Sequence, residues 1–203
     1  CIRDRGASGE QVITAFVTGY DIATRAGRSV WPSHYDAWHP TATLGNIGAA
    51  VAAGKLLGFD ADRMELAIGL AADEAAGLRY CIDHGDFSKL LHPALAAMKG
   101  ILVALMVQGG ARGPRGILED PKSGFCHAFS LEPRPEAALE GLGERYEITN
   151  DIIKAFPTIN CSQAPIQGML ALAQEHDLRP ADIERIHLTR MYRYSSKDQG
   201  INY

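Results

Sequence analysis

Three stretches of the sequence place an ionisable side chain at a structural joint. The first is Trp38-His39-Pro40, in which His39 precedes a segment of small residues. Because the positive end of a helix dipole disfavours a protonated imidazole, we expect His39 to be neutral near pH 7 and able to accept a proton. The alternative is a histidine that only caps or packs. His39 is therefore a candidate general base, and the motif by itself leaves both roles open.

The other two stretches carry lysines. The segment from Asp86 to Pro93 contains Lys89 and His92, for which a solvated surface lysine and a helix-capping histidine are the structural alternatives. Further along, Lys154 interrupts an apolar run near an expected change of domain, where clefts commonly bind ligands. A lysine that only snorkels out of a strand is the alternative there. A base and two cations are thus available for chemistry on an anionic molecule.

These residues must be positioned by helices over most of the chain. Ser8 and Gln11 fit a capping box, Asp62 with Glu65 marks another helix start, and Gly58 marks a helix end. Apolar periodicity predicts helices over residues 9–26, 40–57, 62–76, 92–108 and 135–141. In the second of these, Gly and Ala replace the usual large residues. That composition predicts a helix squeezed between close neighbours.

The pattern changes at about residue 145. Residues 148–156 are expected to be extended, residues 163–176 to be helical, and residues 183–189 to alternate as a half-buried strand does. The predicted fold is therefore mainly α. Residues 1–145 belong to a large all-helical domain, and residues 146–203 form the beginning of a smaller α/β (α+β) domain.

The composition restricts the class of protein. The chain has 203 residues, 46% of them hydrophobic, and a net charge of −4, so we expect no nucleic-acid partner. Gly, Lys or His interrupts the apolar stretches before the ~20 residues of a membrane span, and no apolar leader is visible. Cys1, Cys81, Cys126 and Cys161 lie far apart without a C-x-x-C pair. We therefore predict free thiols, no metal site and a cytoplasmic location.

Three motifs together resemble the MmgE/PrpD family. They are W-H-P-T-A-T-L-G-x-x-G-A-A-x-A-A-G-K-L-L-G at residues 38–58, S-K-L-L-H-P-x-x-A-A-x-x-G at residues 88–100 and K-x-F-P-x-x-x-C at residues 154–161. Their order and spacing agree with the family, and the resemblance runs over essentially the whole chain. Because family chains are considerably longer, we expect this sequence to be a middle portion.

The resemblance implies an all-helical domain and a smaller α/β lid with the active site between them, usually in a homodimer. It implies catalytic roles for His39, Lys89 and Lys154 and no metal or organic cofactor. Tyr35 and His92 are added as candidate substrate-binding residues. The family includes 2-methylcitrate dehydratase, cis-aconitate decarboxylase and iminodisuccinate epimerase, so the implied partner is a small di- or tricarboxylate.

The chemistry shared by such enzymes is proton transfer at a carbon next to a carboxylate. A neutral His39 suits the base or proton donor, while Lys89 and Lys154 bind carboxylates and stabilise the enediolate. We predict a 2-methylcitrate dehydratase-like lyase, with an epimerase or decarboxylase as the alternative. Residues 158–160 depart from the family pattern in the expected substrate pocket. The alternative to an enzyme is a non-catalytic helical module. A structure in which His39, Lys89 and Lys154 lie on separate surfaces would favour that alternative.

Overall fold

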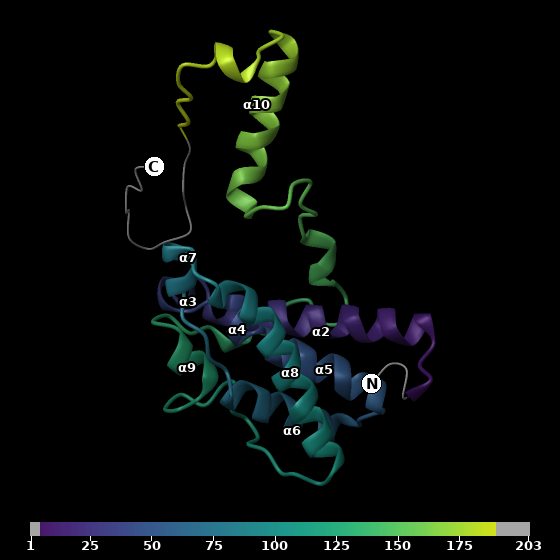
Figure 1. The fold of residues 1–203 in the computed structure, drawn as a ribbon. Helices are drawn as coiled ribbons and strands as arrows, with labels where there is room; N and C mark the ends of the chain where they lie inside the picture. Colours follow the sequence, from purple (N-terminus) through teal and green to yellow (C-terminus); the bar gives the residue numbers. More distant parts are fainter. Residues whose placement is uncertain (1–4, 190–203) are drawn as a thin grey trace. The chain divides into compact units, whose positions relative to one another are not determined.

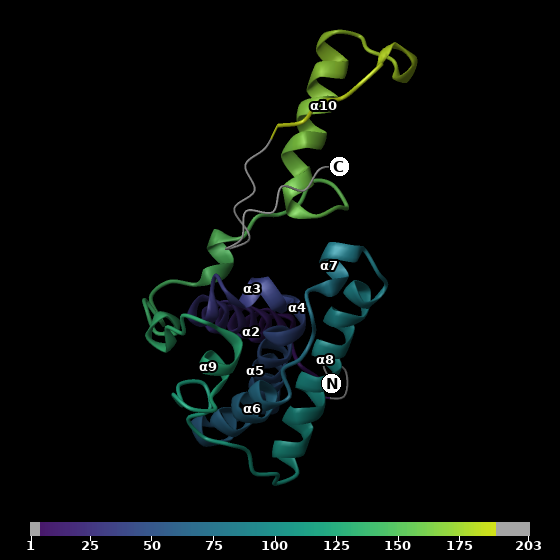
Figure 2. The same cartoon turned by 90° about the vertical axis from the view of Figure 1, so that its left-hand side faces the viewer.

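The computed structural model describes residues 5–189, which fold into helices joined by loops (Figures 1 and 2). Among these residues there is no strand, and a single isolated bridge pairs Trp38 with Leu78. The α-helices are α2 (Gly9–Val30), α3 (His34–Ala37), α4 (Pro40–Thr43), α5 (Gly45–Leu57), α6 (Ala61–Asp73), α7 (Tyr80–His84), α8 (Ser88–Gln108), α9 (Phe125–Phe129) and α10 (Gln163–Glu175). The 3₁₀ helices are η1 (Pro135–Ala138), η2 (Glu147–Asn150), η3 (Asn160–Ser162) and η4 (Pro180–Asp182). The predicted mainly-α fold is confirmed.

The described residues form two compact units, which meet in sequence between Thr149 and Asn150. The first unit contains helices α2 to α9, and the second contains α10. The domain boundary predicted at residues 145 and 146 stays a prediction, as does the assignment of the later residues to a lid.

Helix α5 is the centre of the first unit. It packs against α2, α6 and α8, and Figure 1 shows these four helices side by side. The apolar core gathers residues from all of them and from α9; its fully buried members include Val30, Ile47, Ala50, Ala67 and Ala71. Because this core is built on the helix that follows His39, the position of His39 is tied to the best-packed part of the unit.

The small residues of α5 allow close approach of the neighbouring backbones, as predicted. A side chain at Gly48 would meet the carbonyl oxygen of Gly19 in α2 at 2.8 Å. On the other side, a side chain at Gly100 in α8 would meet the Asn46 carbonyl oxygen and the Ala50 nitrogen, each at 2.6 Å. Since these neighbours are backbone atoms, only glycine fits at either position without moving a helix.

Several helix boundaries differ from those expected. The capping box is confirmed, because Gln11 N–H donates to the Ser8 hydroxyl and Ser8 N–H donates to the Gln11 side chain. The helix expected over 40–57 is divided at Leu44, although Gly58 ends it in the left-handed conformation as predicted. Helix α6 is capped by Asp60, not by Asp62, because the Asp60 carboxylate accepts the Arg63 N–H at 2.9 Å.

Helix α8 begins four residues earlier than predicted. The Asp86 carboxylate accepts the backbone N–H of Ser88 at 2.7 Å as well as its hydroxyl, which starts the helix before Pro93. Pro93 therefore lies inside the helix, in its second turn, where its missing N–H removes the bond that residue 93 would donate to the Lys89 carbonyl. His92 is consequently inside the helix rather than at its cap, contrary to the structural alternative considered above.

Helix α8 is also long and apolar enough to cross a membrane by length and composition, with a mean hydropathy of 1.9. The expectation that apolar stretches are too short for a span is therefore wrong for this segment. One side of α8 packs on α5 through Ala96, Gly100, Val103 and Ala104. The rest of α8 is exposed, since only 28% of the apolar window is buried, and the predicted absence of a membrane partner stays a prediction.

The second unit departs most from expectation. Helix α10 confirms the predicted helix at residues 163–176. Residues 148–156 are not extended, because η2 covers their beginning and loops follow. Residues 183–189 form no strand either. An alternating segment becomes a strand only when another strand accepts its backbone hydrogen bonds, and residues 5–189 provide no such partner.

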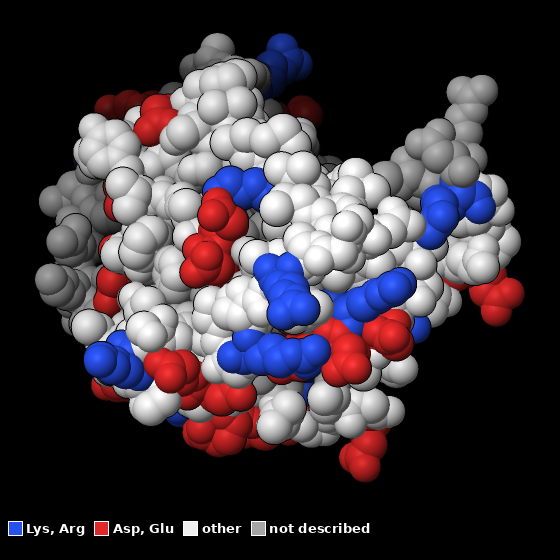
Figure 3. Space-filling view, turned by 90° about the horizontal axis from the view of Figure 1, so that it is seen from below, with Lys and Arg blue, Asp and Glu red and all other residues white. Residues whose placement is uncertain are grey.

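Charged side chains of both signs alternate on the face shown in Figure 3. Arg115 forms ion pairs with Asp62 and Glu65. One charged residue is instead buried: Arg25 on α2 is 1% exposed and pairs with Asp21 at 2.7 Å. Its guanidinium also donates to four backbone carbonyls between residues 138 and 145, so it fastens that loop to α2.

Candidate active site

A short antiparallel contact between two loops positions His39. The His39 N–H donates to the Gly77 carbonyl at 3.0 Å, and the Arg79 N–H donates to the Ala37 carbonyl at 2.9 Å. These bonds flank the bridge between Trp38 and Leu78. The segment before α4 is thereby held against the loop that leads into α7. The imidazole of His39 is delivered to the junction of α4, α7 and α8.

His39 and His92 form a direct pair at this junction. Their Nδ1 atoms are 2.7 Å apart and their ring centroids 4.9 Å apart. One ring must donate and the other accept, since two lone pairs or two N–H groups at this distance repel. His39 is only 8% exposed, while His92 is half-buried. His92 lies one turn after Lys89 on α8, so both project from the same side of that helix.

The environment keeps His39 neutral. The pKa of His39 is lowered to about 4, mainly by burial and to a smaller extent by the positive charges of His92 and Lys89. The predicted neutral imidazole therefore has a different origin from the one proposed on sequence grounds. Helix α4 has only four residues, and the His39 side chain makes no capping bond to it. Desolvation and neighbouring cations, rather than a helix dipole, control the protonation of His39.

Two buried residues that have no predicted site role lie in this part of the unit, and one of them, Cys81, adjoins the pair. Cys81 on α7 is 1% exposed, and its Sγ lies 3.6 Å from His92 Nδ1. Arg79 is 8% exposed; its guanidinium lies over the Tyr35 ring at 4.6 Å and donates to the Tyr35 carbonyl at 3.0 Å. Neither residue belongs to a recognisable motif. The contact between the loops brings Arg79 to Tyr35, and the packing of α7 beside α8 brings Cys81 to His92.

The predicted site residues therefore fall into two groups. His39 and His92 are hydrogen-bonded in the first unit, where the charge of Lys89 acts on His39, and Tyr35 lies under Arg79 in the same unit. Lys154 is exposed and belongs to the second unit. Its predicted role, like the catalytic and substrate-binding roles of the others, stays a prediction. The first unit thus combines a neutral base, its hydrogen-bonded partner and a lysine one turn before that partner.

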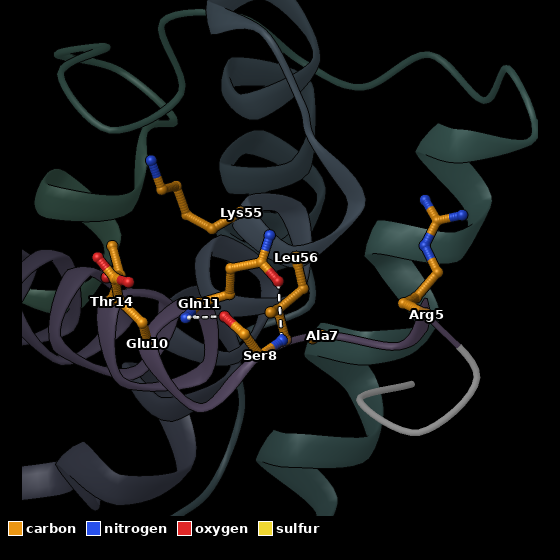
Figure 4. A pocket seen from close by; sticks show the side chains of 8 residues that line it. All are labelled: Arg5, Ala7, Ser8, Glu10, Gln11, Thr14, Lys55 and Leu56. Atoms are coloured by element: carbon orange, nitrogen blue, oxygen red, sulfur yellow. Dashed lines mark hydrogen bonds between the residues drawn. The ribbon is translucent and has the colours of Figure 1, made fainter.

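Two pockets lie elsewhere in the first unit. One of about 860 Å³ is polar and is lined by the start of α2 and the end of α5, including Ser8, Gln11 and Lys55 (Figure 4). Another of about 730 Å³ is lined by Tyr20, Trp31 and residues beside α4. His39, Lys89 and His92 line neither of them. The histidine pair is thus a separate feature, defined by its chemistry rather than by the size of a cavity.

The family of the chain follows from the match of its first unit to a family model. Residues 3–138 match the MmgE/PrpD N-terminal domain, which is two thirds of the chain. The chain belongs to the MmgE/PrpD family. The motifs that carry the resemblance at residues 38–58 and 88–100 both lie within this match.

Curated proteins of known name are similar in sequence to this chain over most of its length. A cis-aconitate decarboxylase of Aspergillus terreus (strain NIH 2624 / FGSC A1156) is 30% identical over 91% of this chain and 38% of the relative. Another cis-aconitate decarboxylase of Aspergillus terreus is 31% identical over 80% of this chain and 34% of the relative. A cis-aconitate decarboxylase-like protein, oryM, of Aspergillus oryzae (strain ATCC 42149 / RIB 40) is 27% identical over 90% and 39%. The chain thus spans less than two fifths of the length of these relatives.

Proposed function

We propose that this chain contributes part of the active site of a cofactor-independent lyase that acts on a small di- or tricarboxylate. The observation that carries the proposal is the buried pair of His39 and His92 beside Lys89, in the family's N-terminal domain. A carboxylate-bearing substrate needs a base for the proton and a cation for the growing negative charge. These three side chains supply both.

The low pKa of His39 makes its free imidazole a weak base. A substrate with several carboxylates would bring negative charge to the site and partly cancel the effect of Lys89 and His92. The pKa of His39 would then rise towards its ordinary value while the substrate is bound. Proton transfer is in this way coupled to binding of an anion, and Lys89 serves both to attract the carboxylate and to stabilise the enediolate.

The reaction that the relatives favour is decarboxylation, because those described above are named cis-aconitate decarboxylases or a protein like them. In a decarboxylation, carbon dioxide leaves the substrate carbon where the other reactions remove a proton. A proton is then delivered to that carbon. The dehydration preferred on sequence grounds uses the same base and cations with a hydroxyl leaving group. Both reactions fit a lyase, and an epimerase differs in returning the proton to the opposite face.

The proposal is tested in the protein that contains this sequence, by assaying cis-aconitate, citrate and 2-methylcitrate with wild type and Lys89→Met. Loss of one preorganised charge is expected to lower kcat by about 10²–10³-fold. The matched control is Lys99→Met, because Lys99 lies on the same helix and donates to the Glu74 carbonyl at 2.9 Å, away from the histidines. Equal activity of the two variants on a substrate that the wild type converts would remove Lys89 from the mechanism.

A homodimer and a cytoplasmic location are further proposals. An interface is supported by the outer side of α8, where apolar residues at helical spacing are between 42% and 56% exposed: Leu91, Leu95, Met98, Leu102 and Leu105. Light scattering should give the mass of two chains, and Leu102→Glu should shift it towards one. A single-chain mass for the wild type at every concentration would contradict the dimer.

A further inference from the structure

Three segments far apart in sequence deliver metal-ligand side chains to one point. His39 precedes α4, Cys81 lies on α7 and His92 on α8, and one ligand atom of each lies within 4.8 Å of the other two. His92 Nδ1 is the shared neighbour, 2.7 Å from His39 Nδ1 and 3.6 Å from Cys81 Sγ. Among residues 5–189, this is the group of three such side chains that meets this distance.

We propose that His39, Cys81 and His92 form a binding site for a thiophilic divalent cation of the zinc class. A thiolate and two imidazoles are the ligands that Zn²⁺ prefers, and three protein ligands leave the fourth tetrahedral position open for water or a carboxylate. The proposal adds a ligand, Cys81, that the proton-transfer chemistry does not use. It also revises the prediction, made from cysteine spacing and from the family resemblance, that the chain lacks a metal site.

The distances are close to those that tetrahedral coordination demands. Bonds of about 2.3 Å to sulfur and about 2.0–2.1 Å to nitrogen place sulfur and nitrogen about 3.6 Å apart and two nitrogens about 3.3 Å apart. The separation of 3.6 Å between Cys81 and His92 already fits. The histidine pair at 2.7 Å would open by roughly half an ångström when the metal replaces their hydrogen bond.

The surroundings of Cys81 also favour a ligand role. The buried thiol has only a weak hydrogen bond to lose on binding a metal, because its S–H donates to the Leu78 carbonyl at 3.6 Å. A thiolate would offset one of the two positive charges of the cation. Ser88 donates to the Asp86 carboxylate and holds the pKa of Asp86 below its ordinary value, so a second negative charge stays close to His92. Lys89 is the cation that opposes binding.

Metal binding would have a consequence for activity. A nitrogen lone pair that is bound to a metal cannot accept a proton, so occupancy of the site would inhibit proton transfer by His39. This consequence rests on the proposed function, whereas the binding itself does not. Zinc would therefore act as an inhibitor here and not as a Lewis acid in the reaction.

The test is a titration of the reduced chain, without substrate, with Co²⁺ as a spectroscopic substitute for Zn²⁺. We expect one equivalent to bind and to produce a thiolate-to-cobalt charge-transfer band, which added Zn²⁺ abolishes. Cys81→Ser should lose the band. The matched control is Cys126→Ser, because Cys126 is also buried, at 3% exposed, but its Sγ donates to Ser29. This control should keep the band and the affinity.

A second variant separates binding from folding. His92→Gln retains the thiol but removes the shared nitrogen, and it should weaken cobalt binding at least tenfold while circular dichroism stays helical. Absence of the band in the wild type, or its persistence in Cys81→Ser, overturns the site. Unchanged affinity in His92→Gln does so as well. Because the titration contains no substrate, its failure leaves the lyase proposal standing, and an inactive enzyme with normal cobalt binding leaves the metal site standing.

Discussion

Replacing Gly100 by alanine should force α8 away from α5 and disturb the histidine pair. The added Cβ would lie 2.5 Å from the Ala49 Cβ and 2.6 Å from both the Ala50 nitrogen and the Asn46 oxygen. Ordinary contacts of this kind are 3.4–4 Å. All three neighbours belong to α5, so they cannot move independently of one another. The two helices must separate locally by about 1 Å to restore ordinary contact distances.

Two opposing terms determine the stability change. Overpacking a close-packed contact costs about 1–3 kcal/mol, whereas alanine in place of glycine inside a helix gains about 1 kcal/mol. Because two of the close neighbours are backbone atoms, we expect the overpacking cost to lie at the upper end of its range. The free energy of unfolding should then fall by about 2 kcal/mol in total. For a chain of this size that corresponds to a fall of about 4–8 °C in Tm.

Thermal unfolding followed by circular dichroism measures this change. The matched control is Gly109→Ala at the end of α8, where an added Cβ meets its nearest atom at 3.4 Å and the backbone φ is −76°. The control should leave Tm within about 2 °C of wild type. In the complete protein Gly100→Ala should also lower activity, because α8 carries His92. Equal Tm values for the two variants would show that the α5–α8 contact is more plastic than its geometry indicates.

Three further results are expected. Arg25→Met leaves the Asp21 carboxylate buried without its cation, so urea unfolding should show a loss of about 3–5 kcal/mol. Ser8→Ala removes half of the capping box with Gln11 and should cost about 1 kcal/mol by the same measurement, with α2 fraying at its start. Burial lowers the pKa of His34, so the unfolded chain binds its proton more readily. Stability should therefore fall as pH drops below the ordinary histidine value, and His34→Gln should reduce that slope; identical slopes would contradict the assignment.

Several local signals were confirmed, although the helix start predicted at Asp62 was wrong because Asp60 caps α6. The capping box at Ser8, the turn at Gly58 and the helix at residues 163–175 depend on neighbours within a few positions, and all three are present. The start of α8 lies at Ser88, four residues before the predicted position, where the Asp86 carboxylate accepts the Ser88 N–H. The strand expected at residues 183–189 failed because a strand requires a distant partner.

The amino-acid sequence by itself determined the mainly helical character, the close packing of α5 and the candidate base and cation at His39 and Lys89. Each of these depends on residue type and on spacing along one segment. The tertiary structure decided that His39, Cys81 and His92 share one point, and that burial controls the pKa of His39. The physical reason is that spatial proximity and desolvation arise from packing between segments. No spacing rule relates a loop before α4 to α7 and α8, which only the folded core brings together.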